Sequence, residues 1–462
     1  MTSLKPSDAL DPQTILAHAR PGPRYTSYPT VPVWTEAVDG ASFAERLQRG
    51  DKADAPLSLY YHLPFCRQRC HFCGCNVVIT AKQDKADRYI DYLEKEMDLV
   101  GSFLASRRGV SQLHFGGGTP TFLKEAQLVR LWRAITSRFH ISDDAELAIE
   151  VDPSVTTREQ IALLRGFGFN RMSFGVQDFT PAVQQQVGRI QSVETTRDLY
   201  DYARALGYQG INFDLIYGLP LQVADEFAQT IDKVIELRPD RIALFSYAHV
   251  PWLHPQQKKM DESRLPGPLL KVQLYQLARA ALLEAGYVAI GMDHFAVPED
   301  ELAAARLTRS LGRNFQGYTA RPRIDTVAFG VSAISDIADS YAQNVKTIIE
   351  YYRKLDEGSL PVERGWRLTD DDILRRDVIH RIMCNFFVDL KRAAADHGVE
   401  PDRFSEALEA LAEAEAQELL KRDGWTLEAL PLGQVLIRNI AMAFDAYLEP
   451  KSEKRQVFSQ TV

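Results

Sequence analysis

Residues 57–75 read Leu57-Ser-Leu-Tyr60-Tyr-His-Leu63-Pro-Phe-Cys66-Arg-Gln-Arg-Cys70-His-Phe72-Cys73-Gly-Cys75. The first seven of these residues are typical of a buried β-strand, and a loop that holds four cysteines within ten residues follows directly. A disulfide framework would spread its cysteines along the chain. Clustering of four of the five cysteines instead indicates metal or redox chemistry in a reducing compartment.

The strand at 57–63 is the first of six strand-like runs, and amphipathic helical segments such as 85–100 and 224–237 separate them. The six runs are residues 57–63, 112–115, 146–151, 171–176, 210–217 and 241–247. Strand and helix in repeated alternation predict an α/β fold with a parallel sheet. Because crossover connections are right-handed, the sheet is expected to curl into a partial (β/α)6 barrel.

One face of the predicted strands carries polar side chains. Asn212 and Asp214 alternate with apolar neighbours in the fifth strand, as do Glu150 in the third and Ser173 in the fourth, which Gln177 follows directly. Parallel strands covered on both faces usually read as continuous apolar runs, which these do not. Barrel active sites lie at the C-terminal ends of the strands, so a polar lumen there implies a ligand.

The charge balance restricts the class of partner. The 462 residues carry a formal charge of −8, from 54 basic and 62 acidic side chains. This argues against nucleic-acid binding, which requires a basic face, but it does not exclude a small anionic substrate held by a few arginines. No apolar run is long enough for a signal peptide or a membrane span, so we expect a cytoplasmic protein, and nothing in the sequence suggests obligate assembly beyond a monomer.

Cys66, Cys70 and Cys73 are spaced so that three thiolates can converge from one tight loop on a cubane iron–sulfur cluster. Three ligands for four irons leave one iron open, and an open iron can chelate the amino and carboxylate groups of S-adenosylmethionine. An electron from the cluster can then break the C–S bond of this cofactor. The alternative is a structural zinc site that includes Cys75, although one residue between Cys73 and Cys75 is a cramped spacing for two ligands of one tetrahedron.

A glycine run, Gly116-Gly117-Gly118-Thr119-Pro120, follows the strand that ends at Phe115. Three glycines let a ligand approach the backbone closely, and we expect N–H groups there to be free to bind its polar end. The alternative is an ordinary loop with no contact to a ligand.

The cysteine spacing, with an aromatic residue before the last cysteine and the glycine run after it, resembles the radical S-adenosylmethionine superfamily. Further segments are similar to the oxygen-independent coproporphyrinogen III oxidase family, and the resemblance extends from about residue 23 to the C-terminus. These segments are residues 23–30 (PRYTSYPT), 73–76 (CGCN), 175–179 (GVQDF), 214–220 (DLIYGLP), 291–296 (GMDHFA), 313–319 (RNFQGYT) and 330–334 (GVSAI).

The resemblance implies oxidative decarboxylation of two propionate side chains of coproporphyrinogen III to vinyl groups, which gives protoporphyrinogen IX for haem biosynthesis without oxygen. A 5′-deoxyadenosyl radical would take a hydrogen from the propionate carbon beta to the carboxylate, after which carbon dioxide leaves and an acceptor takes the remaining electron. The implied cofactors are a [4Fe-4S] cluster and two S-adenosylmethionine molecules per chain. The implied redox partner is an electron donor such as flavodoxin or ferredoxin.

The same resemblance assigns residues by position. Cys66, Cys70 and Cys73 are the expected cluster ligands, and the expected cofactor contacts are Tyr60, Phe72, Gly117, Gly118, Thr119, Glu150, Gln177, Arg189, Asp214, Ala248 and Ile334. Substrate candidates are Arg24, Arg313 and Gln316, while Cys75 and His294 are the candidates for a catalytic role.

Several of these residues have plainer alternatives. Tyr60 could belong to the core, Arg189 could be a solvated arginine, and Glu150 or Asp214 could be a buried carboxylate paired with an arginine. Arg24 and Arg313 could make structural ion pairs. Cys384 is expected to be an inert buried thiol.

We divide the chain into an N-terminal segment (1–55) that covers the active site, a catalytic domain (56–360) and a mostly helical C-terminal domain (361–462), in which 368–390 and 403–422 read as helices. In the family a small β-hairpin usually precedes the last Ile-Arg-Asn helix. About six residues fewer lie between Asp423 and Ile437 here, which predicts an absent or reduced hairpin.

Two rival functions remain on the same scaffold. A sister group of haem-binding chaperones shares the cysteine triad, but typically lacks the cysteine at position 75 and differs over 291–296. A radical methyltransferase is the second rival.

Overall fold

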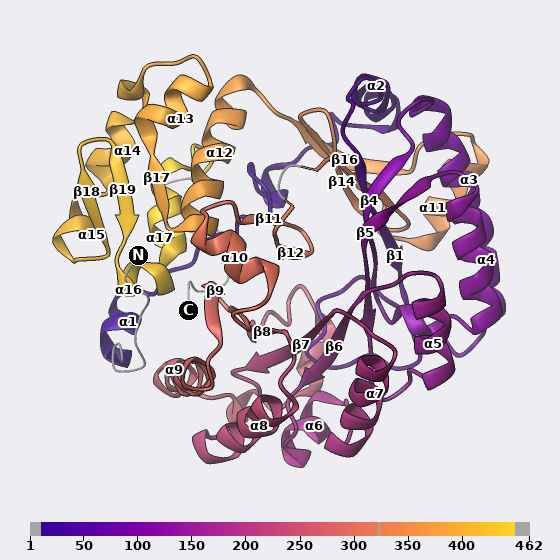
Figure 1. The fold of residues 1–462 in the computed structure, drawn as a ribbon, viewed down its shortest axis with the longest axis horizontal. Coiled ribbons are helices and arrows are strands. Elements are labelled where there is room, and N and C mark those ends of the chain that lie inside the picture. The colour runs from indigo at the N-terminus through magenta and orange to yellow at the C-terminus, as the bar shows by residue number, and fades with distance from the viewer. Residues whose placement is uncertain (1–10, 322–323, 449–462) are drawn as a thin grey trace.

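The computed structural model describes residues 11–321 and 324–448. A curved twelve-stranded sheet dominates it, with the order β16-β15-β14-β13-β1-β4-β5-β6-β7-β8-β10-β9. In Figure 1 this sheet runs through the right-hand and lower parts of the molecule, and the C-terminal lobe stands to the left.

Six consecutive parallel strands form the centre of the sheet and confirm the predicted α/β fold. They are β1 (Leu57–Leu63), β4 (Gly109–Gly117), β5 (His140–Val151), β6 (Arg171–Gln177), β7 (Gly210–Tyr217) and β8 (Arg241–Ser246). The predicted bounds of the first and fifth strands agree with β1 and β7. A seventh parallel strand, β13 (Thr326–Phe329), pairs with β1.

Antiparallel strands extend the sheet at both edges. Beyond β13 lie β14 (Ile334–Asp336), β15 (Ser340–Asn344) and β16 (Val362–Arg367), and beyond β8 lie β10 (His294–Ala296) and β9 (Val288–Gly291). Because β16 and β9 end the strand order without pairing with each other, the barrel is partial.

Amphipathic helices cover the outer face of the sheet (Figure 1). α3 (Asp84–Phe103) buries Ile90, Leu93, Met97 and Val100 at helical spacing, as the sequence predicts. The others are α2 (Gly40–Gly50), α4 (Glu125–Thr136), α5 (Arg158–Gly166), α6 (Pro181–Val187), α7 (Val193–Ala205), α8 (Ala224–Leu237), α9 (Pro268–Glu284) and α11 (Ile348–Asp356).

Short elements complete the body around the lumen. These are β2 (Phe65–Cys66), β3 (Val78–Ile79), β11 (Gly312–Asn314), β12 (Gly317–Thr319) and α10 (Glu301–Leu307). α1 (Pro12–His18) packs against α9. No helix of the described residues has the length and apolar character of a membrane span.

The C-terminal lobe is mostly helical but contains strands that the sequence analysis did not predict. Its elements are α12 (Asp370–Asn385), α13 (Leu390–Asp396), α14 (Ser405–Ala410), α15 (Ala412–Ala416), α16 (Pro431–Val435), α17 (Ile437–Ala441), β17 (Phe387–Asp389), β18 (Leu420–Asp423) and β19 (Thr426–Ala429). The helix expected over 368–390 ends at Asn385, because Phe386 takes a left-handed conformation (φ 55°) and the chain continues as β17.

The hairpin expected to be absent or reduced is present as β18 and β19, which β17 extends to a three-stranded sheet. Asp423 pairs with Thr426 across the two-residue turn Gly424-Trp425, where Gly424 has a φ of 57°. A tight turn and four-residue strands therefore build the hairpin from the shorter segment.

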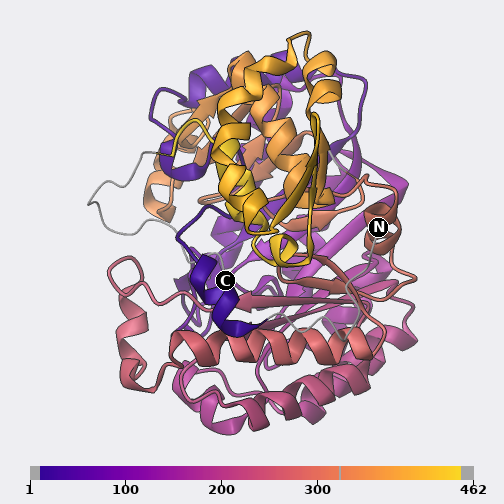
Figure 2. The same ribbon diagram turned by 90° about the vertical axis from the view of Figure 1, so that its left-hand side faces the viewer.

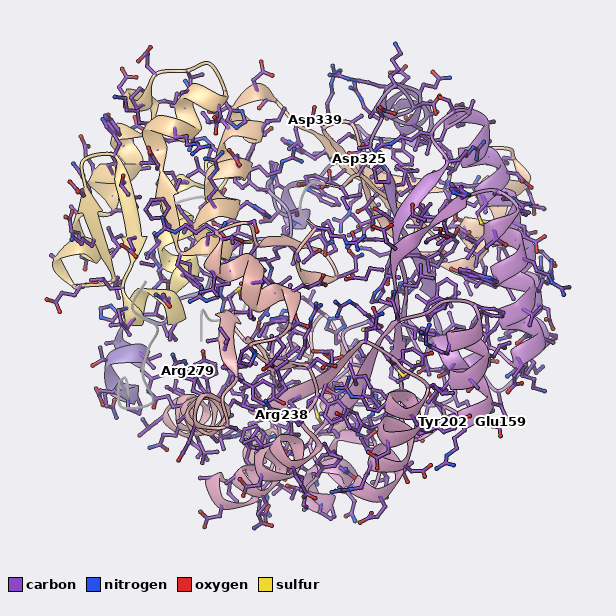
Figure 3. All side chains as sticks on the ribbon, viewed as in Figure 1. Glu159, Tyr202, Arg238, Arg279, Asp325 and Asp339 are labelled. Carbon is purple, nitrogen blue, oxygen red and sulfur yellow. The ribbon has the colours of Figure 1, made fainter. Side chains whose placement is uncertain are left out.

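The boundary between the catalytic domain and the C-terminal lobe also differs from the one expected from the sequence. β16 pairs with β15 in the large sheet, so the boundary expected after residue 360 precedes the last strand of that sheet. Tyr25 and Tyr28 of the N-terminal segment lie in the hydrophobic core of the C-terminal lobe, where Tyr25 donates a hydrogen bond to Asp445 (3.0 Å). Figure 2 shows this lobe standing above α9, and Figure 3 shows side chains filling the space between the lobe and the sheet.

Candidate active site

A cavity of about 620 Å³ lies inside the curved sheet. Inward-facing side chains of β1 and β4–β8 line it together with the cysteine loop and the β11–β12 hairpin. Its lining includes ten of the eleven expected cofactor contacts, all four clustered cysteines, His294 and Gln316; the ten are Tyr60, Phe72, Gly117, Gly118, Thr119, Glu150, Gln177, Arg189, Asp214 and Ile334. Ala248, Arg24 and Arg313 are not part of this lining.

The cysteine loop begins on β2, which carries Cys66 and pairs with β3. Sγ of Cys66 lies 3.3 Å from Oγ1 of Thr119, next to the glycine run. The backbone N–H of Cys75 donates to Sγ of Cys73 (3.4 Å). Both contacts leave the sulfur atoms directed at the cavity, where a shared ligand can reach them.

Contacts from neighbouring segments fix the path of this loop. The Gln68 side chain donates to the carbonyl of Gly188 (2.9 Å), and Nδ1 of His71 lies 2.8 Å from the carbonyl oxygen of Gln186. From the other side, the Gln256 side chain donates to the carbonyl of Cys73. The loop is therefore preorganised by the body of the barrel.

The thiols differ in acidity. Burial raises the pKa of Cys66 to about 11 and also raises that of Cys70, where the nearby charge of Arg189 acts in the opposite direction. Hydrogen bonds from the side chain and backbone of Cys75 lower the pKa of Cys73 to about 6. Because thiolates are the metal ligands, iron binding would have to displace the protons from Cys66 and Cys70.

The donor set fits an iron–sulfur cluster. A cubane takes one thiolate on each of three irons, so its ligands stand farther apart than the ligands of one tetrahedral ion. In the described part of the chain, no three His, Cys, Asp or Glu side chains gather closely enough to hold a single metal ion. Three cavity-facing cysteines, N–H donation to one sulfur and an adjacent polar lumen match the cluster better than zinc.

The glycine run does not present free N–H groups, so that expectation was wrong. Gly117 N–H donates to Oε2 of Glu150 (3.1 Å), Gly118 N–H donates to the Leu63 carbonyl (2.9 Å), and Thr119 N–H donates to the Phe65 carbonyl (2.9 Å). These N–H groups bond the end of β1, the start of β2 and a side chain of β5, which leaves little backbone for an anion.

Close packing explains the glycines instead. Gly117 has a φ of 113°, and a Cβ there would lie 2.7 Å from the ring of His62. A Cβ on Gly118 would lie 2.7 Å from the carbonyl carbon of Pro64. The run therefore lets β4 end against the segment after β1, beside the cysteine loop.

Glu150 carries a charge into the lumen. Burial acts to raise its pKa, but the hydrogen bond and charge of His114, with the Gly117 N–H, lower it below the ordinary value. Nε2 of His114 lies 3.2 Å from Oε1 of Glu150, and the His114 ring stacks on Tyr60 with centroids 5.8 Å apart. An ionised carboxylate that is 43% exposed to the cavity can accept hydrogen bonds from a polar ligand.

Asp214 is held less acidic than Glu150. Burial, followed by the charge of Glu150, raises its pKa to about 6, although the hydrogen bond from Ser173 opposes that shift. Ser173 donates to one oxygen of Asp214 (2.9 Å) and Asn212 donates to the other (2.8 Å). Within the described residues, neither Glu150 nor Asp214 makes an ion pair with an arginine, so the paired-carboxylate alternative does not hold.

Arg189 lines the lumen and is not a solvated arginine. Its side chain is 14% exposed, it forms an ion pair with Asp152 (3.1 Å), and it donates to the Gly175 carbonyl (2.7 Å). Gln177 ends β6 next to it in a left-handed conformation with a φ of 66°. This conformation is uncommon outside glycine and marks the strand end as a functional candidate.

The backbone carbonyls of Phe72 and Ala248 both accept hydrogen bonds from Gln257. Nε2 of Gln257 donates to the Ala248 carbonyl (3.2 Å) and lies 3.4 Å from the carbonyl oxygen of Phe72, to which it also donates. The ring of Phe72 packs on a small apolar cluster that includes Val183 and Tyr247. Ala248 thus supports the cysteine loop from outside the cavity lining.

The substrate candidates separate into two groups. Gln316 lies at the β11–β12 turn and lines the cavity, as does His294, whose Nδ1 lies 2.8 Å from Oδ1 of Asp293. Arg24 forms an ion pair with the other oxygen of Asp293, as its structural alternative predicted. Arg313 directs Nη1 to Sδ of Met292 (3.2 Å), and within the described residues it forms no ion pair.

Sequence reasoning missed two lumen residues that the structure brings together with the predicted ones: His62 and His114. Nε2 of His62 lies 2.9 Å from the carbonyl oxygen of Asn76, just after the cysteine loop. His62 shares the strand parity of Tyr60 in β1, and His114 is the register partner of Tyr60 in β4. The signal that could have found them is therefore the same alternation, read along every strand.

Comparisons with known proteins agree with this geometry. The model of the Radical SAM superfamily matches residues 60–234. Curated oxygen-independent coproporphyrinogen III oxidases of Salmonella typhimurium and Synechocystis sp. are 45% and 43% identical, over 96% and 100% of both chains respectively. A solved structure of coproporphyrinogen III oxidase from Escherichia coli, described as a radical SAM enzyme, is 45% identical with a TM-score of 0.89 and covers 92% of this chain and 97% of its own.

This chain belongs to the oxygen-independent coproporphyrinogen III oxidase family. Membership supports the oxidase interpretation over the haem-binding chaperone, because the relatives match along the whole chain. Radical SAM enzymes use a [4Fe-4S] cluster and S-adenosylmethionine, which accounts for three cysteines placed beside a polar lumen.

Proposed function

We propose that this protein converts coproporphyrinogen III to protoporphyrinogen IX in the cytoplasm, by oxygen-independent oxidative decarboxylation of two propionates to vinyl groups in haem biosynthesis. The observation that carries the proposal is the single cavity where Cys66, Cys70 and Cys73 meet the polar residues of the parallel strands. Full-length similarity to oxidases of the same reaction supports it.

The cofactor side is assigned to the cysteine loop and the strand ends. Cys66, Cys70 and Cys73 would hold the cluster, while Cys75 would stay free beside it. When bound, the cluster and S-adenosylmethionine supply a 5′-deoxyadenosyl radical that removes a hydrogen atom from the propionate. We propose two S-adenosylmethionine molecules per chain, contacted by the ten cavity-lining residues and by Ala248.

The protein's own groups bind and orient. Ionised Glu150 accepts hydrogen bonds from hydroxyl or ammonium groups of a bound ligand, and Asp214 does so at a second position across the lumen. Arg189, held by Asp152, offers positive charge to a ligand carboxylate.

The substrate side is assigned to the opposite wall. Gln316 and His294 line the cavity there, and Arg24 and Arg313 lie behind them as candidates for substrate carboxylates. Residues 11–55, the part of the N-terminal segment that the structure describes, would cover this side, since Arg24 contacts Asp293 next to His294. We propose a monomer that takes its electrons from a flavodoxin or ferredoxin.

The test is anaerobic turnover. Reconstituted protein is incubated with coproporphyrinogen III, dithionite and S-adenosylmethionine, and porphyrins are separated after oxidation. We expect protoporphyrin together with 5′-deoxyadenosine, and neither when S-adenosylmethionine is omitted. Formation of 5′-deoxyadenosine with no loss of propionate from the porphyrinogen would contradict the assigned substrate.

A further inference from the structure

A groove lies on the outer surface behind the cysteine loop. Its volume is about 1010 Å³, and it lies between the segment after Cys75, the start of α3 and the length of α11. The lining consists of Asn76, Val77, Val78, Lys85, Arg88, Lys346, Thr347, Ile348, Ile349, Tyr352, Arg353, Asp356 and Glu357. None of these residues belongs to the proposed reaction chemistry.

The groove and the active-site cavity share a wall. Val77 lines both of them, so a single layer of chain separates the outer surface from the cysteines. Asn76 closes that wall, because its side chain donates to the Lys346 carbonyl (2.8 Å) while its own carbonyl oxygen lies 2.9 Å from Nε2 of His62.

The backbone next to the groove bonds directly to the cysteine loop. Val78 and Ile79 form β3, which pairs with β2 so that Ile79 lies opposite Cys66. Thr80 N–H donates to the Cys66 carbonyl (3.0 Å). Paired strands lie about 4.8 Å apart, so a partner in the groove would come within one strand spacing of the backbone of a proposed cluster ligand.

The rim of the groove is basic. Lys85, Arg88 and Lys346 are exposed, and within the described residues no carboxylate lies at ion-pairing distance from any of them. Asp356 is engaged by Lys95 (2.7 Å), and Glu357 is engaged by Arg353 (2.7 Å). Three cations without an ion-pair partner among the described residues thus gather here on a chain whose formal charge is −8, although the charge of Asp356 also acts on Arg88 at longer range.

Apolar side chains occupy the same surface. Ile349 is 79% exposed and lines the groove, and Ile79 is 43% exposed beside it. Arg88 lies over the ring of Tyr352, 5.0 Å from its centroid. An apolar and aromatic centre with a charged rim is the composition of a protein–protein interface.

We propose that this groove is the docking surface for a small acidic one-electron carrier protein. The inference rests on the proposed function, which requires one electron to pass from outside to the cluster before S-adenosylmethionine is cleaved. The carrier's reduced centre loses that electron and the oxidised cluster gains it, with no bond made or broken in the transfer. Charge complementarity selects an acidic partner, and the shared wall at Val77 supplies the short path.

The test compares two matched triple variants. Lys85→Glu/Arg88→Glu/Lys346→Glu reverses the rim of the groove. Lys391→Glu/Lys421→Glu/Arg422→Glu reverses two lysines and one arginine that are also exposed and belong to α13 and β18, which lie across the molecule from α3 and α11 (Figure 1). Iron content and far-ultraviolet circular dichroism verify that both variants fold and load the cluster.

Association with an acidic flavodoxin is measured by biosensor kinetics at about 50 mM and about 300 mM salt. For the groove variant we expect association at low salt to slow by at least about tenfold and its salt dependence to flatten, while the control stays within about twofold of wild type. Because the readout is binding, apoprotein can be measured in parallel.

Dithionite separates this proposal from the proposed function. With dithionite as reductant, both variants should cleave S-adenosylmethionine at the wild-type rate, whereas only the groove variant should fail with reduced flavodoxin. Equal loss of flavodoxin binding in both variants, unchanged binding in the groove variant, or a dimer that the groove variant dissociates would each overturn the assignment. Failure of wild type with dithionite would instead count against the proposed function.

Discussion

Replacement of Glu96 by glutamine tests how the body of the protein holds one edge of the cavity. Glu96 projects from α3, is 2% exposed and accepts three hydrogen bonds. The donors are Gly330 N–H (2.8 Å), the Tyr351 hydroxyl (2.6 Å) and the Asn344 side chain (2.7 Å). Through Gly330 it fixes the turn that leads to Ile334 in the cavity lining.

The magnitude follows from the environment of the carboxyl group. Burial raises the pKa of Glu96 from an ordinary 4.5 to about 7, against the three hydrogen bonds that favour ionisation. Each unit of pKa shift corresponds to about 1.4 kcal/mol, so ionisation of Glu96 destabilises the folded state relative to the unfolded state by roughly 3 kcal/mol. Because the pKa of Glu96 is higher in the folded than in the unfolded protein, the folded protein holds the carboxyl proton more tightly. The stability that this proton contributes is therefore fully present below pH 4.5 and is lost as the pH rises to 7.

The assay is urea unfolding of wild type and Glu96→Gln from pH 5 to pH 8 without oxygen. Other groups titrate alike in both proteins, so the difference in unfolding free energy isolates Glu96. We expect wild type to lose about 2 to 3 kcal/mol relative to the variant over this range. Because glutamine offers one acceptor oxygen to three donors, the variant should also be less stable than wild type by about 1–3 kcal/mol at pH 5.

Tyr351→Phe is the companion variant, since it removes a donor and leaves the carboxyl group in place. Loss of that hydrogen bond should raise the pKa of Glu96 further and move the fall in stability to higher pH. A difference between wild type and Glu96→Gln that stays constant from pH 5 to pH 8, or that grows in favour of wild type, would refute the reasoning.

Three further predictions concern the site. Glu150→Ala and Asp214→Ala should each weaken S-adenosylmethionine binding about ten- to hundredfold with unchanged iron content, because a hydrogen bond to a charged acceptor contributes roughly 1.5–3 kcal/mol. Wild-type affinity of both variants in equilibrium dialysis would place the two carboxylates outside the site. Gly117→Ala should lower the thermal unfolding midpoint and the iron content, since its Cβ would lie 2.7 Å from the His62 ring at a φ of 113°, and wild-type values for both would contradict this packing argument. Exposure to air should bleach the holoprotein irreversibly, because an iron without a protein ligand is open to oxygen, and full activity after prolonged aerobic storage would speak against it.

The central strands could be predicted from the sequence because they satisfy local rules. β1 and β7 have the predicted bounds, and polar parity in β5, β6 and β7 located Glu150, Gln177 and Asp214 at the lumen. In such strands each residue's face is decided by its immediate neighbours, so the pattern can be interpreted without tertiary information.

The remaining features depend on distant contacts. Glu96 lies among Leu93, Met97 and Val100 on the buried face of α3, and its three partners are 234 to 255 residues away in sequence. No local pattern indicates that a carboxylate there is satisfied. The N–H groups of the glycine run were expected to be free, since the local sequence does not show that the sheet brings their acceptors, Leu63, Phe65 and Glu150, next to them.

The C-terminal errors have a different origin. Helical propensity continues past Asn385, but a left-handed Phe386 ends α12 and β17 joins the β18–β19 hairpin. A count of residues missing relative to the family left open whether the hairpin is absent or only reduced, and a two-residue turn allows the short hairpin that forms. Tertiary packing overrides local preference at both places.

The most direct test of the central claim is the iron content and electron paramagnetic resonance of single alanine variants at Cys66, Cys70, Cys73 and Cys75. Each variant is reconstituted without oxygen and measured with and without S-adenosylmethionine. Three thiolates with one open iron predict that Cys75→Ala keeps a four-iron cluster whose spectrum shifts on addition of the cofactor, while the other three variants lose most of their iron. Loss of iron in Cys75→Ala, with a responsive cluster retained in any of the other three, would contradict the account.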